Sequence, residues 1–260
     1  MKRKSYPTDL SLRQWKLLEP MLPPPELFGR KRSVDLREII NALCYLARAG
    51  CQWRMLPEGF PKWQTVYYYF RKWRQSQWFV ALNQSLRKLA RVKSGKEENP
   101  SAAIIDSQSV KTDEQAESTG YDAGKKVKGR KRHILVDTLG LLLIAKVLTA
   151  DIQDRDGAKL LFSKVKEQMP RLYLIWADGG YRGKLIIWVA VKCRWILEIV
   201  KRNDDLKGFQ VLPKRWIVES TFAWLNRNRR LSKDYERKTT SSEAWIYFSM
   251  SILMLKRLNC

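Results

Sequence analysis

Residues Ala102-Ala103-Ile104-Ile105-Asp106-Ser107-Gln108-Ser109-Val110-Lys111 form an apolar run that reaches a carboxylate and then turns polar. Four apolar residues before an acid predict a buried strand that carries Asp106 to the edge of a sheet. Asp178, which closes the apolar run 172–177, stands in a comparable setting. Glu219 lies in a predicted helix that starts near Arg215. We expect these three carboxylates to meet, because of the order of the elements around them.

Strand-like and helix-like segments alternate after residue 100. We predict strands over 102–110, 132–138, 141–149, 172–178 and 194–200, and helices over 156–169, 182–191 and 215–228. The turn at Gly140 makes the second and third strands a hairpin, whereas the later β-α-β steps imply parallel pairing. We therefore expect an α/β fold, in which helices cover a mixed five-stranded sheet. The order of these elements is that of the ribonuclease-H-like fold. In that fold the strands ending at Asp106 and Asp178 are neighbours, and the helix with Glu219 can reach the same point.

The first hundred residues predict an all-helical domain. Helices are expected over 8–22, over 35–49 and, as one or two elements, over 62–92. A polar stretch ending at Pro100 breaks this pattern. We therefore assign a helical DNA-binding domain to 1–95 and the catalytic domain to 96–260. The first domain could hold a helix-turn-helix-like module, although no recognition helix stands out.

Composition and charge narrow the class of protein. The 260 residues carry a formal net charge of +24, and 45% are hydrophobic with eleven tryptophans, which excludes a disordered chain. A folded protein with this charge is expected to bind a polyanion such as DNA. Four cysteines without a close pair and a single histidine argue against a zinc site or a disulfide framework. No run predicts a membrane span or a secretory signal, so we expect a cytoplasmic, nucleoid-associated protein.

Several basic segments are candidates for DNA contacts. The segment 53–79 interleaves aromatic rings with cations, which suits either a helical core or a surface that stacks on bases, and we favour its cations as contacts. The basic loop 121–133 and the cations around Glu219 could also be ordinary solvated charge. The cations expected to contact DNA are Arg71, Lys72, Arg74, Lys125, Lys126, Lys128, Arg130, Lys131, Arg132, Arg215, Arg227, Arg229 and Arg230.

Each candidate acid also has a structural interpretation. Asp106 could cap a strand end, Asp178 could belong to an Asp-Gly turn, and Glu219 could pair with Arg215 one helical turn earlier. Taken together, three acids without His or Cys partners suit Mg²⁺ or Mn²⁺. Two such ions about 4 Å apart can stabilise the attacking and leaving oxygens of a displacement at phosphorus.

Other polar residues near these segments are expected to be structural. Asp137 precedes the hairpin turn, and His133 is interpreted as a strand residue, with a role near the site left open. Asp151, Asp154 and Asp156 precede a predicted helix, which they would cap.

Five stretches together resemble one known family. They are 50–57 (Gly-Cys-Gln-Trp-Arg-Met-Leu-Pro), 63–67 (Trp-Gln-Thr-Val-Tyr), 105–111 (Ile-Asp-Ser-Gln-Ser-Val-Lys), 177–181 (Ala-Asp-Gly-Gly-Tyr) and 218–225 (Val-Glu-Ser-Thr-Phe-Ala-Trp-Leu). With them the chain resembles the DDE transposases of the bacterial insertion-sequence-five family, in the insertion-sequence-four/five group. The resemblance covers nearly the whole chain and implies that Asp106, Asp178 and Glu219 are the catalytic, metal-binding triad.

The resemblance also implies a mechanism and partners. It implies Mg²⁺- or Mn²⁺-dependent cleavage of double-stranded DNA at the ends of an insertion sequence and strand transfer into target DNA, by a homodimer or higher oligomer. Arg215 matches an arginine of the wider group's motif, but Leu212 and Asn226 replace its tyrosine and lysine. Arg227 or Arg230 could substitute for those contacts. Two alternatives remain open: a nuclease that only hydrolyses, and an inactive DNA-binding protein derived from such an enzyme.

Overall fold

The computed structural model describes residues 3–25, 32–200 and 213–258. Its N-terminal part is helical, as predicted. The elements are α1 (Leu12–Leu18), the 3-10 turn η1 (Glu19–Met21), α2 (Leu36–Ala49), the 3-10 turn η2 (Trp53–Met55), α3 (Trp63–Gln75) and α4 (Trp78–Lys93). Ser11 and Gln14 form a capping box at the start of α1. Gly50 ends α2 with a left-handed φ of 72°, and a Cβ there would lie 2.9 Å from Arg229 Cβ.

The sheet is built around β1 (Ala102–Lys111). The other strands are β2 (Gly120–Asp122), β3 (Val127–Asp137), β4 (Leu142–Thr149), β5 (Leu174–Ala177) and β6 (Ile196–Ile199). On one side β3 pairs antiparallel with β1 and β4; on the other, β5 pairs parallel with β1 and β6. This order and these directions confirm the ribonuclease-H-like fold. The short β2, which pairs with the start of β3, was not predicted.

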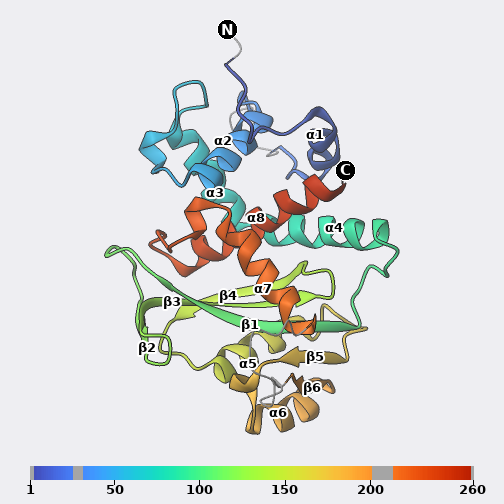
Figure 1. Cartoon of the computed structure of the whole chain (residues 1–260). Helices are drawn as coiled ribbons and strands as arrows, with labels where there is room; N and C mark the ends of the chain where they lie inside the picture. The colour runs from blue at the N-terminus through green and yellow to red at the C-terminus, as the bar shows by residue number, and fades with distance from the viewer. Residues whose placement is uncertain (1–2, 26–31, 201–212, 259–260) are drawn as a thin grey trace.

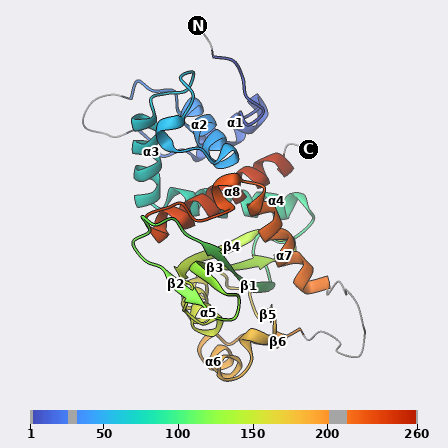
Figure 2. The same cartoon turned by 60° about the vertical axis from the view of Figure 1, so that its left-hand side comes forward.

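Helices cover both faces of the sheet (Figures 1 and 2). The later helical elements are α5 (Asp154–Val165), the 3-10 turn η3 (Gly179–Tyr181), α6 (Lys184–Cys193), α7 (Pro213–Asn226), the 3-10 turn η4 (Arg229–Leu231) and α8 (Thr239–Leu258). Ala103 and Ile105 of β1 pack in the core with α5 and α6, whereas Ile104 packs with residues of α7 and α8. This alternation follows from the two-residue period of a strand, and it places Asp106 on the α7 side.

Helix α8 lies between the N-terminal helices and the sheet (Figures 1 and 2) and was missing from the sequence prediction. The Trp245 ring stacks on Phe70 of α3 with centroids 4.7 Å apart. The Tyr247 hydroxyl accepts a hydrogen bond from the Ala145 amide of β4 at 3.0 Å. One hydrophobic core therefore contains residues from both sides of the domain boundary predicted between residues 95 and 96. The predicted division separates two segments that share this core. None of the described helices is both long and apolar enough to span a bilayer.

Candidate active site

Asp106 and Asp178 lie on neighbouring parallel strands, as predicted. Ile104 of β1 is opposite Trp176 of β5, and each aspartate follows two residues later in the chain, Asp106 within β1 and Asp178 just after the end of β5. Burial raises the pKa of Asp106 to about 6, and the negative charge of Asp178 adds to this rise. A hydrogen bond from the Ser107 amide and the charges of Lys125 and Arg215 oppose it. The two carboxylates thus share one electrostatic environment.

Asp178 also has the structural role that its Asp-Gly sequence indicates. Its Oδ1 accepts a hydrogen bond from the Gly180 amide at 2.9 Å, which caps η3. The turn fixes the carboxylate at the carboxyl end of β5, where sheets of this kind gather functional groups. The turn and the active-site interpretations of Asp178 are therefore compatible.

Glu219 lies on α7 and pairs with Arg215. Helix α7 packs over β1, and Arg215 Nη2 donates to Glu219 Oε1 at 3.2 Å across one helical turn. Arg215 also lowers the pKa of Asp106, so its guanidinium group is electrostatically coupled to both acids. The Glu219 side chain is 45% exposed.

The described parts of the chain do not hold a preformed metal cage. Within residues 3–25, 32–200 and 213–258, no three His, Cys, Asp or Glu side chains are arranged closely enough to hold a metal ion as they stand. The donor set nevertheless fits a hard divalent cation: one desolvated carboxylate on the central strand β1, a second just after the neighbouring strand β5, and a third on an adjacent helix. A cation would favour the charged form of Asp106 that burial opposes.

Two polar residues beside this site were missed by sequence reasoning. Asp154 was expected to cap α5; instead its Oδ1 accepts a hydrogen bond from Ser107 Oγ at 2.7 Å and pairs with Lys131 Nζ at 3.2 Å. Tyr181 is fully buried, and burial together with the charges of Asp106, Asp154 and Asp178 raises its pKa well above the usual value. The Asp154 segment carries no signal of this role, whereas Tyr181 lies in one of the five stretches that carry the family resemblance.

His133 is a buried strand residue. It pairs with Ser107 across the β1–β3 ladder, and Gly157 of α5 packs directly against its ring. Burial lowers the pKa of His133 to about 4, so the ring is neutral at physiological pH.

Many of the predicted DNA-contacting cations are exposed. Arg71, Lys125, Lys126, Lys128, Arg227 and Arg229 all face solvent. Lys125 is next to the candidate active site, because its Nζ donates to the Ser107 carbonyl at 3.1 Å. Lys72 and Arg215 are partly buried, and Arg74 turns toward α8 and donates to Ser241 Oγ.

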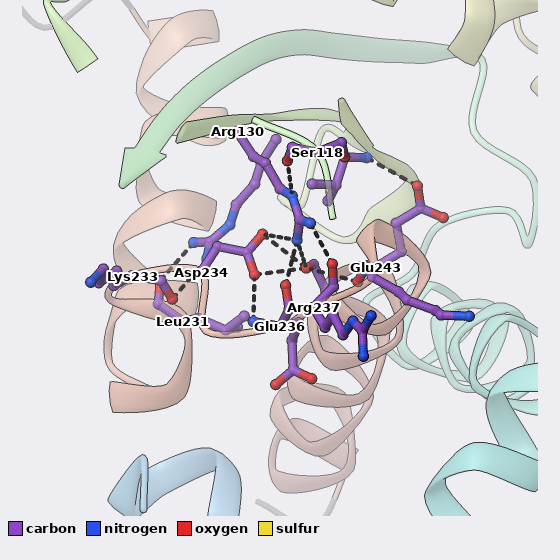
Figure 3. Close-up of polar contacts among 12 residues, drawn as sticks. Ser118, Arg130, Leu231, Lys233, Asp234, Glu236, Arg237 and Glu243 are labelled. Carbon is purple, nitrogen blue, oxygen red and sulfur yellow. Dashed lines mark hydrogen bonds and ion pairs between the residues drawn. The ribbon is translucent and has the colours of Figure 1, made fainter. Parts of the chain in front are cut away.

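Arg130 is not a surface cation, which corrects the prediction for this residue. It is 0% exposed and lies in a buried network with the segment before α8 (Figure 3). Its guanidinium donates to the carbonyls of Ser118, Glu236 and Arg237 at 3.0, 2.6 and 2.7 Å and pairs with Asp234 at 3.4 Å. Every donor nitrogen is therefore occupied within the protein.

Three more cations are corrected for the same reason. Arg132 is 0% exposed and donates to the Leu231 carbonyl at 2.6 Å. Lys131 binds the Ile152 carbonyl besides its two acidic partners, Asp122 and Asp154. Arg230 pairs with Glu236 at 2.6 Å, and its guanidinium lies over the rings of Trp53 and Trp245, so it cannot substitute for the motif's missing cation. Strand β3 begins at Val127 instead of residue 132, which turns half of the predicted loop into buried sheet.

The aromatic segment 53–79 is largely core. Phe70, Trp73, Trp78 and Phe79 are buried, whereas Tyr67 and Tyr68 are 40% and 49% exposed. The position of Leu212, where the wider group has tyrosine, lies outside the described residues. Asn226, at the position of the motif's lysine, is exposed at the end of α7.

Comparison with known proteins places the chain in a family. Residues 97–255 match the transposase DDE domain family, and residues 10–83 match a family described as a putative transposase of the IS4/5 family. A putative transposase for insertion sequence element IS402 from Burkholderia cepacia is 28% identical over 127 residues, which are 45% of this chain and 59% of that relative's length. The structure titled "Crystal structure of the Mos1 Strand Transfer Complex" aligns over 91% of this chain and 79% of its own, with 11% identity and a TM-score of 0.32. Since the first of these matches spans more than half of the sequence, the chain belongs to the transposase DDE domain family.

Proposed function

We propose that this protein is a metal-dependent DNA transposase that cleaves DNA at the ends of its insertion sequence and joins those ends to target DNA. One observation carries the proposal. Asp106 lies within β1, Asp178 directly follows the neighbouring parallel strand β5, and Asp106 is desolvated beside the negative charge of Asp178. Such a carboxylate pair suits cation binding, and the family membership supplies the reaction class.

Asp106, Asp178 and Glu219 would hold the divalent ions, Mg²⁺ or Mn²⁺ and two in number. When bound, the ions supply charge stabilisation at the reacting phosphate and an activated oxygen nucleophile. Arg215 pairs with Glu219, and the Gly180 amide orients Asp178. No Ser or Cys nucleophile paired with His is required, and the single histidine is buried and neutral.

The DNA would follow the exposed cations near these acids. Lys125, Lys126 and Lys128 belong to the β2–β3 hairpin, whose contact with Ser107 places it beside Asp106. Arg227 and Arg229 follow the helix that carries Glu219. We infer that this surface grips the DNA backbone, that the enzyme works as a homodimer or higher oligomer on DNA, and that it is nucleoid-associated.

The direct test is to incubate the protein with a labelled duplex of its insertion-sequence end, a target duplex and Mg²⁺. A transposase gives both nicked and joined products, and neither forms with EDTA. Nicks without joined products indicate the nuclease that only hydrolyses. Binding without cleavage in Mg²⁺ or Mn²⁺ indicates the inactive DNA-binding derivative.

DNA affinity is expected to fall steeply with salt, with a log–log slope of about −0.9 per phosphate contact. Changing Lys125, Lys126 and Lys128 together to Ala should make that slope shallower by about two to three units, because each lysine faces solvent. Fluorescence anisotropy between about 50 and 200 mM salt measures the slope. A matched triple substitution at Lys159, Lys164 and Lys192, on α5 and α6, should leave it nearly unchanged. Equal slopes for both triple variants would contradict the proposal that Lys125, Lys126 and Lys128 contact the DNA backbone.

The stability of the metal-free protein is expected to reflect the raised pKa of Asp106. An unfolded aspartate titrates near 3.9, whereas this carboxyl titrates at about 6 in the fold. Its ionisation therefore opposes folding: the cost is absent below pH 4, grows between the two values and is complete above pH 6. Asp106→Asn should raise the free energy of unfolding at pH 8 by on the order of 2 kcal/mol and have little effect at pH 4. Urea unfolding in EDTA at both pH values measures this, and an equal effect at both would contradict the assignment.

A further inference from the structure

Helix α3 has one buried face and one exposed face. Val66, Phe70 and Trp73 are buried in the core and mark the inner face. The residues on the opposite side of the helix, all of them exposed, are Gln64, Tyr68, Arg71 and Gln75. Because successive members of this set are three or four residues apart, they form a single row along the helix.

The side chains of this row are of the kind that reads base pairs. Arginine forms two hydrogen bonds with guanine, and glutamine forms two with adenine, in the major groove of DNA. Gln64, Arg71 and Gln75 make no hydrogen bond or ion pair with any described residue, whereas Arg74 of the same helix donates to Ser241 Oγ. From Gln64 to Gln75 the row is about 16 Å long, at 1.5 Å per residue, which is the length of about five base pairs.

The charge of α3 favours DNA as the partner. The helix contains three Lys or Arg residues and no acid. Arg54 and Lys62, both exposed, precede it, and the connection 50–62 holds a single acid, Glu58. Phosphates line both sides of the major groove, so cations beside the row would contact phosphates while the row itself faces the bases.

No other helix in the described ranges presents arginine and glutamine together on one exposed row. The exposed residues of α4 include Ser85, Leu89 and Val92, which are short or apolar. Helices α5 and α7 expose the acids Asp156 and Glu219. The connection from α2 to α3 is longer than the three- or four-residue turn of a helix-turn-helix, so the assignment rests on the outer face of α3 and not on that motif.

We propose that α3 is the helix that recognises the ends of the insertion sequence, with Gln64, Arg71 and Gln75 facing base edges in the major groove. This inference rests on the proposed function, because it names the protein surface that distinguishes an end from other DNA. In Figure 2, α3 lies along the left-hand border of the molecule, and β2 lies on the same side. A duplex on α3 therefore extends along the side that carries the β2–β3 hairpin.

The test measures the preference for a duplex of the insertion-sequence end over a scrambled duplex of the same length and composition, by fluorescence anisotropy at one salt concentration. Arg71→Lys keeps the positive charge but cannot form the bidentate contact. Gln64→Ala combined with Gln75→Ala removes two neutral side chains. Both variants should lower the preference by about 5- to 150-fold, the range of one bidentate base contact, and leave the affinity for the scrambled duplex close to wild type.

Gln84→Ala is the matched control, since Gln84 lies on α4 and its amide group donates to Gln168 at 3.0 Å. It should keep the wild-type preference. The α3 variants change only exposed side chains, so they should unfold at close to the wild-type temperature. A second probe is an end duplex in which 7-deazapurines remove the N7 acceptors of the major groove. Wild-type protein should bind this duplex more weakly than the normal end, and the α3 variants should show a smaller loss.

Wild-type protein that prefers the end duplex while both α3 variants keep that preference overturns this inference alone. Equal weakening on the end and scrambled duplexes also overturns it, because α3 would then contact phosphates and not bases. Wild-type protein that cleaves the end duplex without preferring it has the same consequence. If wild-type protein neither prefers the end duplex nor cleaves it in Mg²⁺, the proposed function itself fails, and the inference with it.

Discussion

Asp106→Asn is expected to reduce metal-dependent cleavage of an end duplex by at least about a thousandfold while DNA affinity stays close to wild type. A metal ion contributes several kcal/mol of transition-state stabilisation, and each 1.4 kcal/mol is a factor of ten in rate. Asn keeps the size of the side chain but removes the charge that a hard cation requires. Asp178→Asn and Glu219→Gln should have the same effect, because none of the three acids is expected to contact phosphate directly.

Single-turnover cleavage in Mg²⁺ and mobility shift in EDTA separate the two effects. Asp156→Asn is the matched control, since Asp156 is an exposed acid near the start of α5 whose ion-pair partner is the surface residue Lys159. It should retain near-normal cleavage. If one of the three triad variants cleaved normally, that acid would be misassigned. Glu219 is the most informative case because its carboxylate pairs with Arg215 on the same helix, and Asp154→Asn is the next variant to test if Glu219→Gln is active.

The sequence predicted the part of the site that a strand pattern can encode. An apolar run followed by an acid occurs at both Asp106 and Asp178. Once the order of the strands is known, this pattern is enough to predict that the two acids lie close together, because matching positions of adjacent parallel strands are side by side. The third acid depended on the family resemblance, since a single glutamate on a helix carries no spacing signal. Asp154 and Tyr181 could not be found from local patterns, because their proximity to the acids depends on how α5 and η3 pack.

Helix α8 was missed for a different reason. Its residues are buried on nearly all sides, between α4, the N-terminal helices and β4, and the segment therefore lacks the polar face that identifies an amphipathic helix. Its serines also weaken the apolar signal, although Ser251 Oγ is satisfied by the Tyr247 carbonyl at 2.8 Å. Packing on both sides of a helix erases the periodicity by which a sequence reveals it.

The basic loop was mispredicted in the opposite way. Its positive charges were recognised, but several of the cations predicted to lie on the DNA-contacting surface are buried in the protein. Alternate residues of β3 face opposite sides of the sheet, so Arg130 and Arg132 point toward η4 and the start of α8. Buried arginine is rare unless it is paired, and the pairing acid, Asp234, lies more than a hundred residues away. A sequence pattern cannot show a partner at that separation.

That buried pair carries the largest expected effect on stability. Arg130→Ala should lower the free energy of unfolding by about 3–5 kcal/mol, because it leaves the 2% exposed Asp234 without its cation and strands the carbonyls of Glu236 and Arg237. Asp234 would keep the hydroxyl of Ser242 at 2.8 Å, which satisfies part of the carboxylate but does not neutralise it. Urea unfolding at pH 7 measures the loss.

Lys128→Ala is the control for this experiment, since Lys128 lies two residues earlier on the same strand and faces solvent. Its effect on stability should be within about 0.5 kcal/mol, whereas its effect on DNA affinity should be visible at low salt. Asp234→Asn tests the pair from the other side, and the double variant should lose less stability than the sum of the single variants, because the two residues are coupled. If Arg130→Ala kept near-wild-type stability and specifically weakened DNA binding, Arg130 would have to be assigned to the DNA-contacting surface. The opposite result would show that Arg130, although it lies in a basic stretch, serves to join the segment before α8 to the sheet.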